Sequence, residues 1–246
     1  MSVFLTEKQA LFLHVPRTGG RWVKRALLNS KIEIDLSWQW KASDFYRIPS
    51  HALLGHYRAD CFARVSYVFA FVRHPVKLYS SFWRIGKSAI SRHEEHTAKS
   101  YFANKMRRSI EALSRWKPNF DEWLDEMLEE EPAWATRMFE RFVGPEGGEF
   151  CHFIGRTETL EQDMIQVMSI LGYRLEWLRY YREEYPKHRK RRRRKYHMTN
   201  VIPEVELTPE QVKRIERSER VMIRRFFGEE TFKKRVYRNF KTGELS

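Results

Sequence analysis

The feature that most constrains this fold is a unit that recurs three times along the chain. Each unit is a short apolar run, a turn that contains glycine or proline, and a segment whose apolar residues have helical spacing. The runs and their helices are 10–15 with 20–28, 65–72 with a helix that begins at Pro75, and 150–154 with 158–171. Because strands and helices alternate, the sequence predicts an α/β fold with a parallel sheet.

The remaining segments fit around these units in a single domain of 246 residues, a length that can bury a sizeable core. Two helices, 119–130 and 132–142, are expected at the periphery of the sheet. Thr208 opens a capping box with proline at the first helical position, which predicts a helix that ends at Phe227. This helix belongs to a C-terminal helical segment over 208–240.

Composition limits the partners and the compartment. The 46 Lys and Arg residues exceed the 32 Asp and Glu residues, and the net charge of +14 favours anions such as nucleotides, acidic sugars, nucleic acid or acidic lipid. Cys61 and Cys151 are too few for a disulfide framework and are expected to be free thiols. The N-terminal residues lack a signal-peptide pattern, and no apolar run approaches about 20 residues, so we expect a cytoplasmic protein without a membrane span.

The first turn, His14–Trp22 (HVPRTGGRW), joins a predicted strand to a predicted helix. Backbone amides and the helix dipole favour a phosphate there, and two glycines let the backbone approach it closely. An ordinary glycine turn is the alternative, since short glycine motifs are weak signals. A Walker A loop would end in Gly-Lys-Ser/Thr, whereas this turn ends in Gly20-Arg21-Trp22, so the hydroxyl that holds magnesium in NTP hydrolysis is missing.

Three segments in order along the chain carry a resemblance to a known family. In the first, a cation, a small polar residue, glycine and tryptophan stand at Arg17, Thr18, Gly19 and Trp22. In the second, Tyr67–Pro75 (YVFAFVRHP) is followed by Ser81, eight residues after its arginine, and the third is Phe153–Leu160 (FIGRTETL). These segments resemble the 5′-phosphosulfate loop, the 3′-phosphate-binding strand and helix, and a segment beside the nucleotide in sulfotransferases that use 3′-phosphoadenosine-5′-phosphosulfate (PAPS).

This resemblance implies a P-loop-like three-layer α/β fold, with a central parallel sheet flanked by helices, and catalysis without a metal. It also implies an O-sulfotransferase that moves a sulfuryl group from PAPS to a hydroxyl and releases 3′-phosphoadenosine-5′-phosphate (PAP). A fourth segment, Leu54–Asp60 (LGHYRAD), is similar to the Gly-His segment of the heparan and chondroitin 2-O-sulfotransferases. The expected acceptor is therefore a carbohydrate.

The resemblance also assigns roles within the nucleotide site. Arg73 can fork two hydrogen bonds to the 3′-phosphate and Ser81 can add one. The backbone amides of Thr18 to Trp22, Gly20 and Arg21 included, are expected to hold the 5′-phosphosulfate, and Trp22 offers a face for adenine. The alternatives are an arginine that merely ends a strand, a serine on a helix and a tryptophan of the core.

Transfer also needs a base for the acceptor hydroxyl, and a histidine suits that role at neutral pH. The Gly-His resemblance assigns it to His56, with His51 and His14 in reserve. Arg17 departs from the family pattern, which has lysine at the position that neutralises and protonates the leaving oxygen. Arginine keeps the charge but is a poor proton donor, so we expect Arg17 to stabilise the departing PAP electrostatically.

Two polar segments are expected outside the core. The first, 88–108, has few apolar anchors and is expected to be a mobile excursion. The second, a basic loop over 186–200, holds eight Lys and Arg residues in the nine positions 187–195. It can be a solvated loop, a nucleic-acid or localisation patch, or a rim that gathers an acidic acceptor. The rival functions are a nucleic-acid-binding protein that uses 187–195 and a P-loop kinase that needs magnesium; the sequence does not identify the acceptor.

Overall fold

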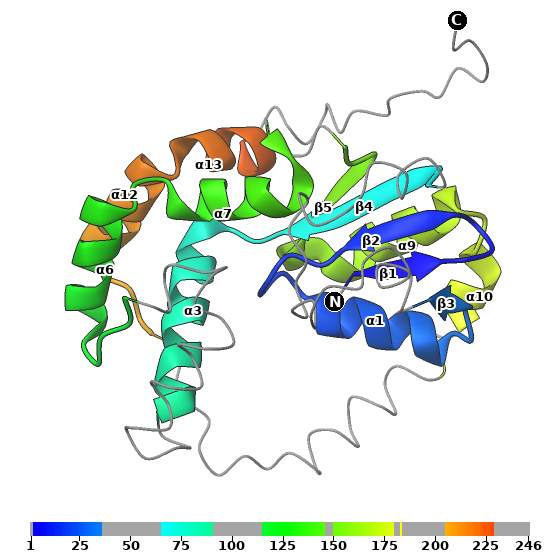
Figure 1. The fold of residues 1–246 in the computed structure, drawn as a ribbon, viewed down its shortest axis with the longest axis horizontal. Helices are drawn as coiled ribbons and strands as arrows, with labels where there is room; N and C mark the ends of the chain where they lie inside the picture. Colours follow the sequence, from blue (N-terminus) through cyan, green and yellow to red (C-terminus); the bar gives the residue numbers. More distant parts are fainter. Residues whose placement is uncertain are drawn as a thin grey trace, which may run out of the picture.

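A mixed sheet of five strands forms the centre of the described part of the protein (Figure 1). The computed structural model describes residues 2–35, 65–90, 115–145, 150–179, 183 and 205–228. The strands are β1 (Val3–Leu5), β2 (Ala10–Leu13), β3 (Ile34–Asp35), β4 (Tyr67–Val72) and β5 (Phe153–Arg156). Their order across the sheet is β3-β1-β2-β4-β5.

The three strands of the repeated unit, β2, β4 and β5, are parallel, as the sequence predicts. Leu13 lies opposite Ala70, and Val72 lies opposite Arg156, so the carboxyl ends of these strands meet at one edge of the sheet. β1 and β3 extend the sheet on the other side of β2 and run antiparallel to their neighbours. These two short strands were not predicted from the sequence.

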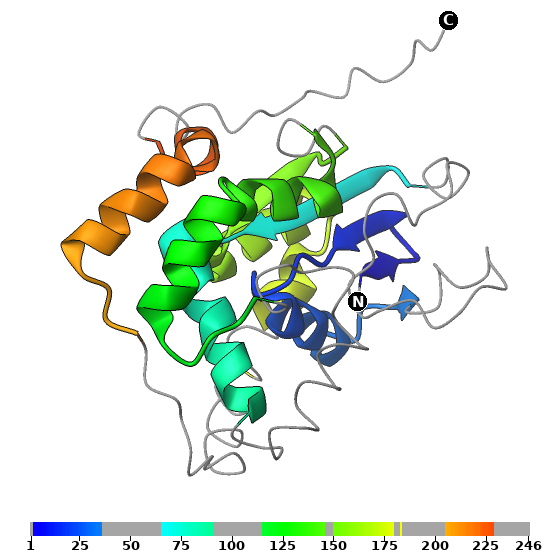
Figure 2. The same cartoon turned by 60° about the vertical axis from the view of Figure 1, so that its left-hand side comes forward.

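The sheet separates two hydrophobic cores because side chains alternate along each strand. Phe69 and Phe71 of β4 face one core together with α1 (Gly20–Asn29) and α9 (Leu160–Ile170). Val68, Ala70 and Val72 face the other core, and the helices on that face are α3 (Pro75–Ile90), α6 (Phe120–Glu130), α7 (Trp134–Val143), α12 (Pro209–Ser218) and α13 (Arg220–Phe227). Figure 2 shows these five helices gathered on one side of the sheet. The expected three-layer α/β architecture is therefore confirmed.

Aromatic side chains fill the core under α3. Tyr79, Trp123 and Trp134 are all buried, and the Tyr79 and Trp134 rings meet edge to face with centroids 5.1 Å apart. Such a contact adds to the free energy gained from removing their apolar area from water. This packing fixes α3 against α6 and α7, and α3 is the helix that follows the second repeated strand.

The helices expected at 119–130 and 132–142 are present as α6 and α7, with Asn119 as the N-cap of α6. The third unit differs at its boundaries. The sequence predicted its strand over 150–154, but β5 is Phe153–Arg156, because pairing with β4 selects that stretch; Phe150 is 47% exposed. A 3₁₀ turn at Thr157–Thr159 then precedes α9, and α10 (Arg174–Arg179) follows it.

The helix predicted over 208–227 begins with the expected capping box but is divided in two. Thr208 Oγ1 accepts from the Gln211 amide, and Gln211 Oε1 accepts from the Thr208 amide. α12 then ends at Ser218 and α13 starts at Arg220, so the prediction of a single continuous helix was wrong. The residue at the break, Glu219, is completely buried.

Several sequence predictions lie outside the described residues. These are His51, His56, Cys61, the basic segment 186–200, the 88–108 excursion beyond Ile90, and the C-terminal segment after Gly228. Among the helices of the described ranges, none has the length and the apolar composition that crossing a membrane requires.

Candidate functional site

The three repeated turns come together at the carboxyl edge of β2, β4 and β5. The segment 14–19 follows β2, Arg73 and His74 follow β4, and 157–159 follows β5. In open α/β sheets this edge is where ligands bind, because the turns there are close together and helix N-termini point toward it. The sequence motifs therefore share one location in space although the first and the third are far apart along the chain.

The first turn places the N-terminus of α1 at this edge. Its N-cap is Gly19, with φ 87°, and no side chain caps the helix. The amides of Trp22 and Val23 both bond to the Gly19 carbonyl, at 2.7 and 3.2 Å. In an α-helix the first amides have no acceptor within the helix, and the dipole favours negative charge beside them. The N-terminus of α1 is thus placed where an anion could bind, but the anion site expected at the amides of residues 18–22 stays a prediction, and the Trp22 amide is already bonded to the Gly19 carbonyl.

Gly20 is required by its neighbour His14, and Gly19 by its left-handed backbone with φ 87°. A Cβ on Gly20 would lie 1.9 Å from Cδ2 of His14, and one on Gly19 would lie 2.7 Å from Cδ2 of Leu160 in α9. The His14 ring stacks on Phe12 beneath the turn, with centroids 5.9 Å apart. His14, an alternative candidate for the base, thus packs against the turn at Gly20.

Two residues of the turn set its shape. Thr18 is buried, and its hydroxyl donates to the Val15 carbonyl at 2.9 Å, which closes the turn from inside. Arg17 has a left-handed backbone with φ 65°, an uncommon conformation for a residue that carries a side chain. This conformation directs the Arg17 side chain toward α3 and its carbonyl toward Arg73.

Arg17 joins the first motif to the second. Its Nε donates to Ser81 Oγ at 2.8 Å, and Arg73 Nη1 donates to the Arg17 carbonyl at 3.3 Å. These bonds cross 64 and 56 residues of sequence. Ser81 is buried on α3, whereas Arg73 is half-buried at the end of β4. The structure therefore assembles Arg17, Arg73 and Ser81 into one cluster.

Positive charge is concentrated around Arg17. Loss of hydration at its guanidinium, and the like charges of Arg73, Arg21 and Arg84, lower the pKa of Arg17 to about 10. Arg17 stays protonated at neutral pH, and three further guanidinium groups lie within electrostatic range of it. Like charges brought together at low hydration favour a bound anion strongly. Arg84 was not among the predicted site residues; it lies three residues after Ser81 and thus on the same face of α3.

Residues of the third motif form hydrogen bonds to the carboxyl end of β4. The Thr157 hydroxyl donates to the Val72 carbonyl at 2.9 Å, and Glu158 Oε1 accepts from the His74 amide at 3.1 Å. Asp163 of α9, itself buried, accepts from the Arg156 amide at 2.6 Å and from the Thr159 hydroxyl at 2.8 Å. These bonds fasten the turn after β5 to the end of β4, where Arg73 lies.

Two aromatic residues border this cluster. Trp22 is half-buried and packs partly against the core under α1, so its predicted contact with adenine stays a prediction. The His74 ring meets Phe227 of α13 edge to face, with centroids 4.8 Å apart. Burial, opposed in part by Glu158, lowers the pKa of His74. No local pattern predicts this contact, because the two residues are far apart along the chain.

His56, the predicted base, lies outside the described residues, so its place relative to Arg17 stays a prediction. Within the ranges the structure describes, no three His, Cys, Asp or Glu side chains are grouped so that they could hold a metal ion.

Comparison with known proteins adds one match. The family model described as the sulfotransferase family matches residues 3–230. No curated protein and no solved structure matches the chain significantly.

Proposed function

The chain belongs to the sulfotransferase family, and on that premise we propose that it transfers a sulfuryl group from PAPS to a carbohydrate hydroxyl and releases PAP. The observation that carries the proposal is the cluster at the carboxyl edge of the sheet. There Arg17 bonds to Ser81 at 2.8 Å, beside Arg73 and the N-terminus of α1. One cluster thus offers two sets of anion donors, which suits a nucleotide with phosphates on both its 3′ and 5′ positions.

The residues of this cluster fit the donor, and we refer to Arg17–Trp22, Arg73 and Ser81 as the donor site. The first amides of α1 would hold the 5′-phosphosulfate. Arg73 can fork two hydrogen bonds to the 3′-phosphate, and the Ser81 hydroxyl can add a third. Recognition of a 3′-phosphate distinguishes PAPS from ATP and ADP, which lack that group.

The transfer requires two contributions from the protein, which are removal of a proton from the acceptor and stabilisation of the leaving group. PAPS supplies the sulfuryl group; the acceptor oxygen forms a bond to sulfur as the bond from sulfur to the bridging phosphate oxygen breaks. His56 would take the proton of the acceptor hydroxyl. Its pKa of about 10 keeps Arg17 protonated at neutral pH, so it would stabilise the negative charge that develops on the departing phosphate. We assign it a role by charge because a phosphate leaving group of low basicity does not need a proton.

The carbohydrate acceptor rests on the similarity of 54–60 to the 2-O-sulfotransferases, and a cytoplasmic location rests on composition. The basic run 187–195 would gather an acidic acceptor if it lies at the rim of the site. Specificity in folds of this kind is set by surface loops, so the acceptor has to be identified by assay.

A thermal-shift panel of PAP, AMP, ADP and ATP, with and without magnesium, tests the nucleotide class without knowledge of the acceptor. PAP is expected to stabilise the protein most, by about 2.7 kcal/mol at a hundredfold excess over its dissociation constant, and without magnesium. Equal shifts for PAP and ADP would contradict recognition of the 3′-phosphate. A shift by ATP that needs magnesium would favour a kinase instead.

A further inference from the structure

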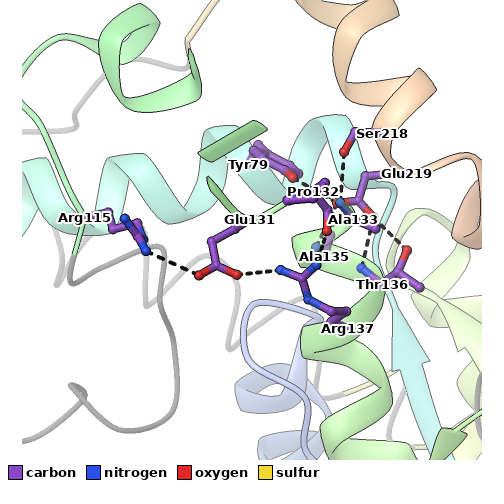
Figure 3. Close-up of polar contacts among 10 residues, drawn as sticks. All are labelled: Tyr79, Arg115, Glu131, Pro132, Ala133, Ala135, Thr136, Arg137, Ser218 and Glu219. Carbon is purple, nitrogen blue, oxygen red and sulfur yellow. Dashed lines mark hydrogen bonds and ion pairs between the residues drawn. The ribbon is translucent and has the colours of Figure 1, made fainter. Parts of the chain in front are cut away.

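On the face of the sheet that carries α3, a buried carboxylate links the break between α12 and α13 to both α3 and α7. Glu219 stands at the break between α12 and α13 and has no exposed surface. Its Oε1 accepts from the Tyr79 hydroxyl at 2.9 Å and from the Ala135 amide at 2.8 Å. Its Oε2 accepts from the amide and the hydroxyl of Thr136, at 3.0 and 2.7 Å (Figure 3). Four donors thus satisfy a charge that would otherwise be costly to bury.

Part of this network caps α7. The N-cap of α7 is Ala133, in a left-handed conformation with φ 56°, and alanine has no side-chain acceptor for the first amides of the helix. Glu219 supplies that acceptor from 84 residues away, and an anion at a helix N-terminus also interacts favourably with the dipole. Ser218 Oγ accepts from the Ala133 amide at 2.9 Å. The break between α12 and α13 therefore places two acceptors at the start of α7.

The remaining bond reaches α3, the helix of the donor site. Burial and the adjacent Glu219 carboxylate raise the pKa of Tyr79 well above its ordinary value, so its hydroxyl stays a neutral donor. Tyr79 lies two residues before Ser81 and six after Arg73. A bond from Tyr79 to Glu219 therefore fixes the rotation of α3 between the two residues assigned to the 3′-phosphate.

A second contact ties the same C-terminal helices to the start of α3. Phe227, at the end of α13, packs on His74, the residue after Arg73. Phe226 packs edge to face on Phe139 of α7, with centroids 5.3 Å apart. α13 is thus held at its start by Glu219 and at its end by these aromatic contacts, and it touches the 73–81 segment at both places.

From these contacts we infer that Glu219 is a positioning residue for the 3′-phosphate subsite, acting through Tyr79 on the orientation of α3. The inference rests on the proposed function, because it concerns the subsite formed by Arg73 and Ser81. Glu219 does not touch the donor itself. Its effect is on where Ser81 and Arg73 lie relative to the loop 17–22, and charge-assisted hydrogen bonds weaken steeply when their geometry shifts.

The test compares the dissociation constants of PAP and AMP, which share a 5′-phosphate and differ in the 3′-phosphate. Tyr79→Phe keeps the ring in its contact with Trp134 and removes only the bond to Glu219. We expect it to weaken PAP by about tenfold, because a displaced Ser81 would lose its hydrogen bond to the 3′-phosphate, and to leave AMP within about twofold. Glu219→Gln keeps an oxygen for only one of the two pairs of donors, so it should lower the melting temperature because the other two donors then face the amide NH2 group.

Thr208→Ala is the matched control. It removes the N-cap of α12 and so loosens the same helix at its far end, but it leaves Glu219 and Tyr79 intact. We expect it to lower the melting temperature and to leave the ratio of the PAP and AMP constants unchanged. A role in stability alone predicts the same behaviour for Tyr79→Phe, so an unchanged ratio in that variant would overturn the inference.

The two proposals fail in different ways. A wild-type protein that binds PAP no better than AMP would refute the donor site, and this inference with it. A wild type that prefers PAP, together with a Tyr79→Phe variant that keeps the full preference or loses PAP and AMP equally, would refute only the positioning role of Glu219.

Discussion

Replacement of Arg17 by lysine tests whether the site is as electropositive as the structure indicates. Poor hydration and three neighbouring arginines lower the pKa of Arg17 to about 10, from an ordinary 12.5. A lysine starts from about 10.4, so the same surroundings would lower its pKa to roughly 8. Arg17→Lys should therefore carry its charge at pH 7 and lose it by pH 9, whereas the wild-type arginine remains charged at both.

The assay is the affinity for PAP, measured by calorimetry from pH 6.5 to 9.5. The phosphates of PAP are fully ionised above about pH 7.5, so the ligand does not titrate in the decisive range. Binding takes up a proton wherever the free variant is neutral, so the affinity of Arg17→Lys should fall by up to about tenfold per pH unit above 8. The wild type should show no such fall up to pH 9.5. Arg25→Lys, a change at an exposed position on α1, is the matched control and should follow the wild type.

Parallel pH profiles for the wild type and Arg17→Lys would refute this reasoning, because they would mean that the neighbouring arginines do not act on residue 17. Single-turnover transfer at saturating PAPS adds a second test. If Arg17 acts by charge, Arg17→Lys should react at nearly the wild-type rate at pH 7, and Arg17→Ala should be about a hundredfold slower. A faster Arg17→Lys enzyme would indicate proton donation, and an unimpaired Arg17→Ala enzyme would remove Arg17 from the site.

Further substitutions test separately the contacts to the 3′-phosphate, the proposed base and the turn at Gly20. Arg73→Ala or Ser81→Ala should weaken PAP by about tenfold and AMP little, as isothermal calorimetry can show, since only PAP carries the 3′-phosphate; equal losses would indicate general damage. His56→Ala should keep its PAP affinity and lose transfer by about a hundredfold or more in a single-turnover assay; full activity would assign the base elsewhere. Gly20→Ala should cost about 1–3 kcal/mol in denaturant unfolding, because its Cβ meets the His14 ring. The double variant with His14→Ala should recover part of that cost, and no recovery would argue against the contact.

The sequence predicted the central architecture because local signals mark it. Continuous apolar runs identify buried parallel strands, and Pro75 and the Thr208 capping box mark helix starts by their own backbone chemistry. β1 and β3 were missed because strands of three and two residues have no periodicity to detect. The β5 boundary was wrong because pairing with β4, a long-range effect, decides which residues of 150–156 form the strand.

The residues of the proposed donor site were selected from the sequence, but the contacts among them were not. Motif spacing located Arg17, Arg73 and Ser81 separately, whereas their bonds cross 64 and 56 residues and depend on the order of the strands. Arg84 carries only a local signal, its helical spacing from Ser81. No local signal marks Glu219. It is buried because the predicted helix breaks there, whereas the apolar pattern of the sequence continues through the break.

The most direct test of the central claim is a crystal structure of the protein with PAP. We expect the 5′-phosphate to bind at the first amides of α1, near Gly20 and Arg21, and the 3′-phosphate to lie within hydrogen-bond distance of both Arg73 and Ser81. A nucleotide bound elsewhere on the protein, or one bound with its 3′-phosphate away from Arg73 and Ser81, would contradict it.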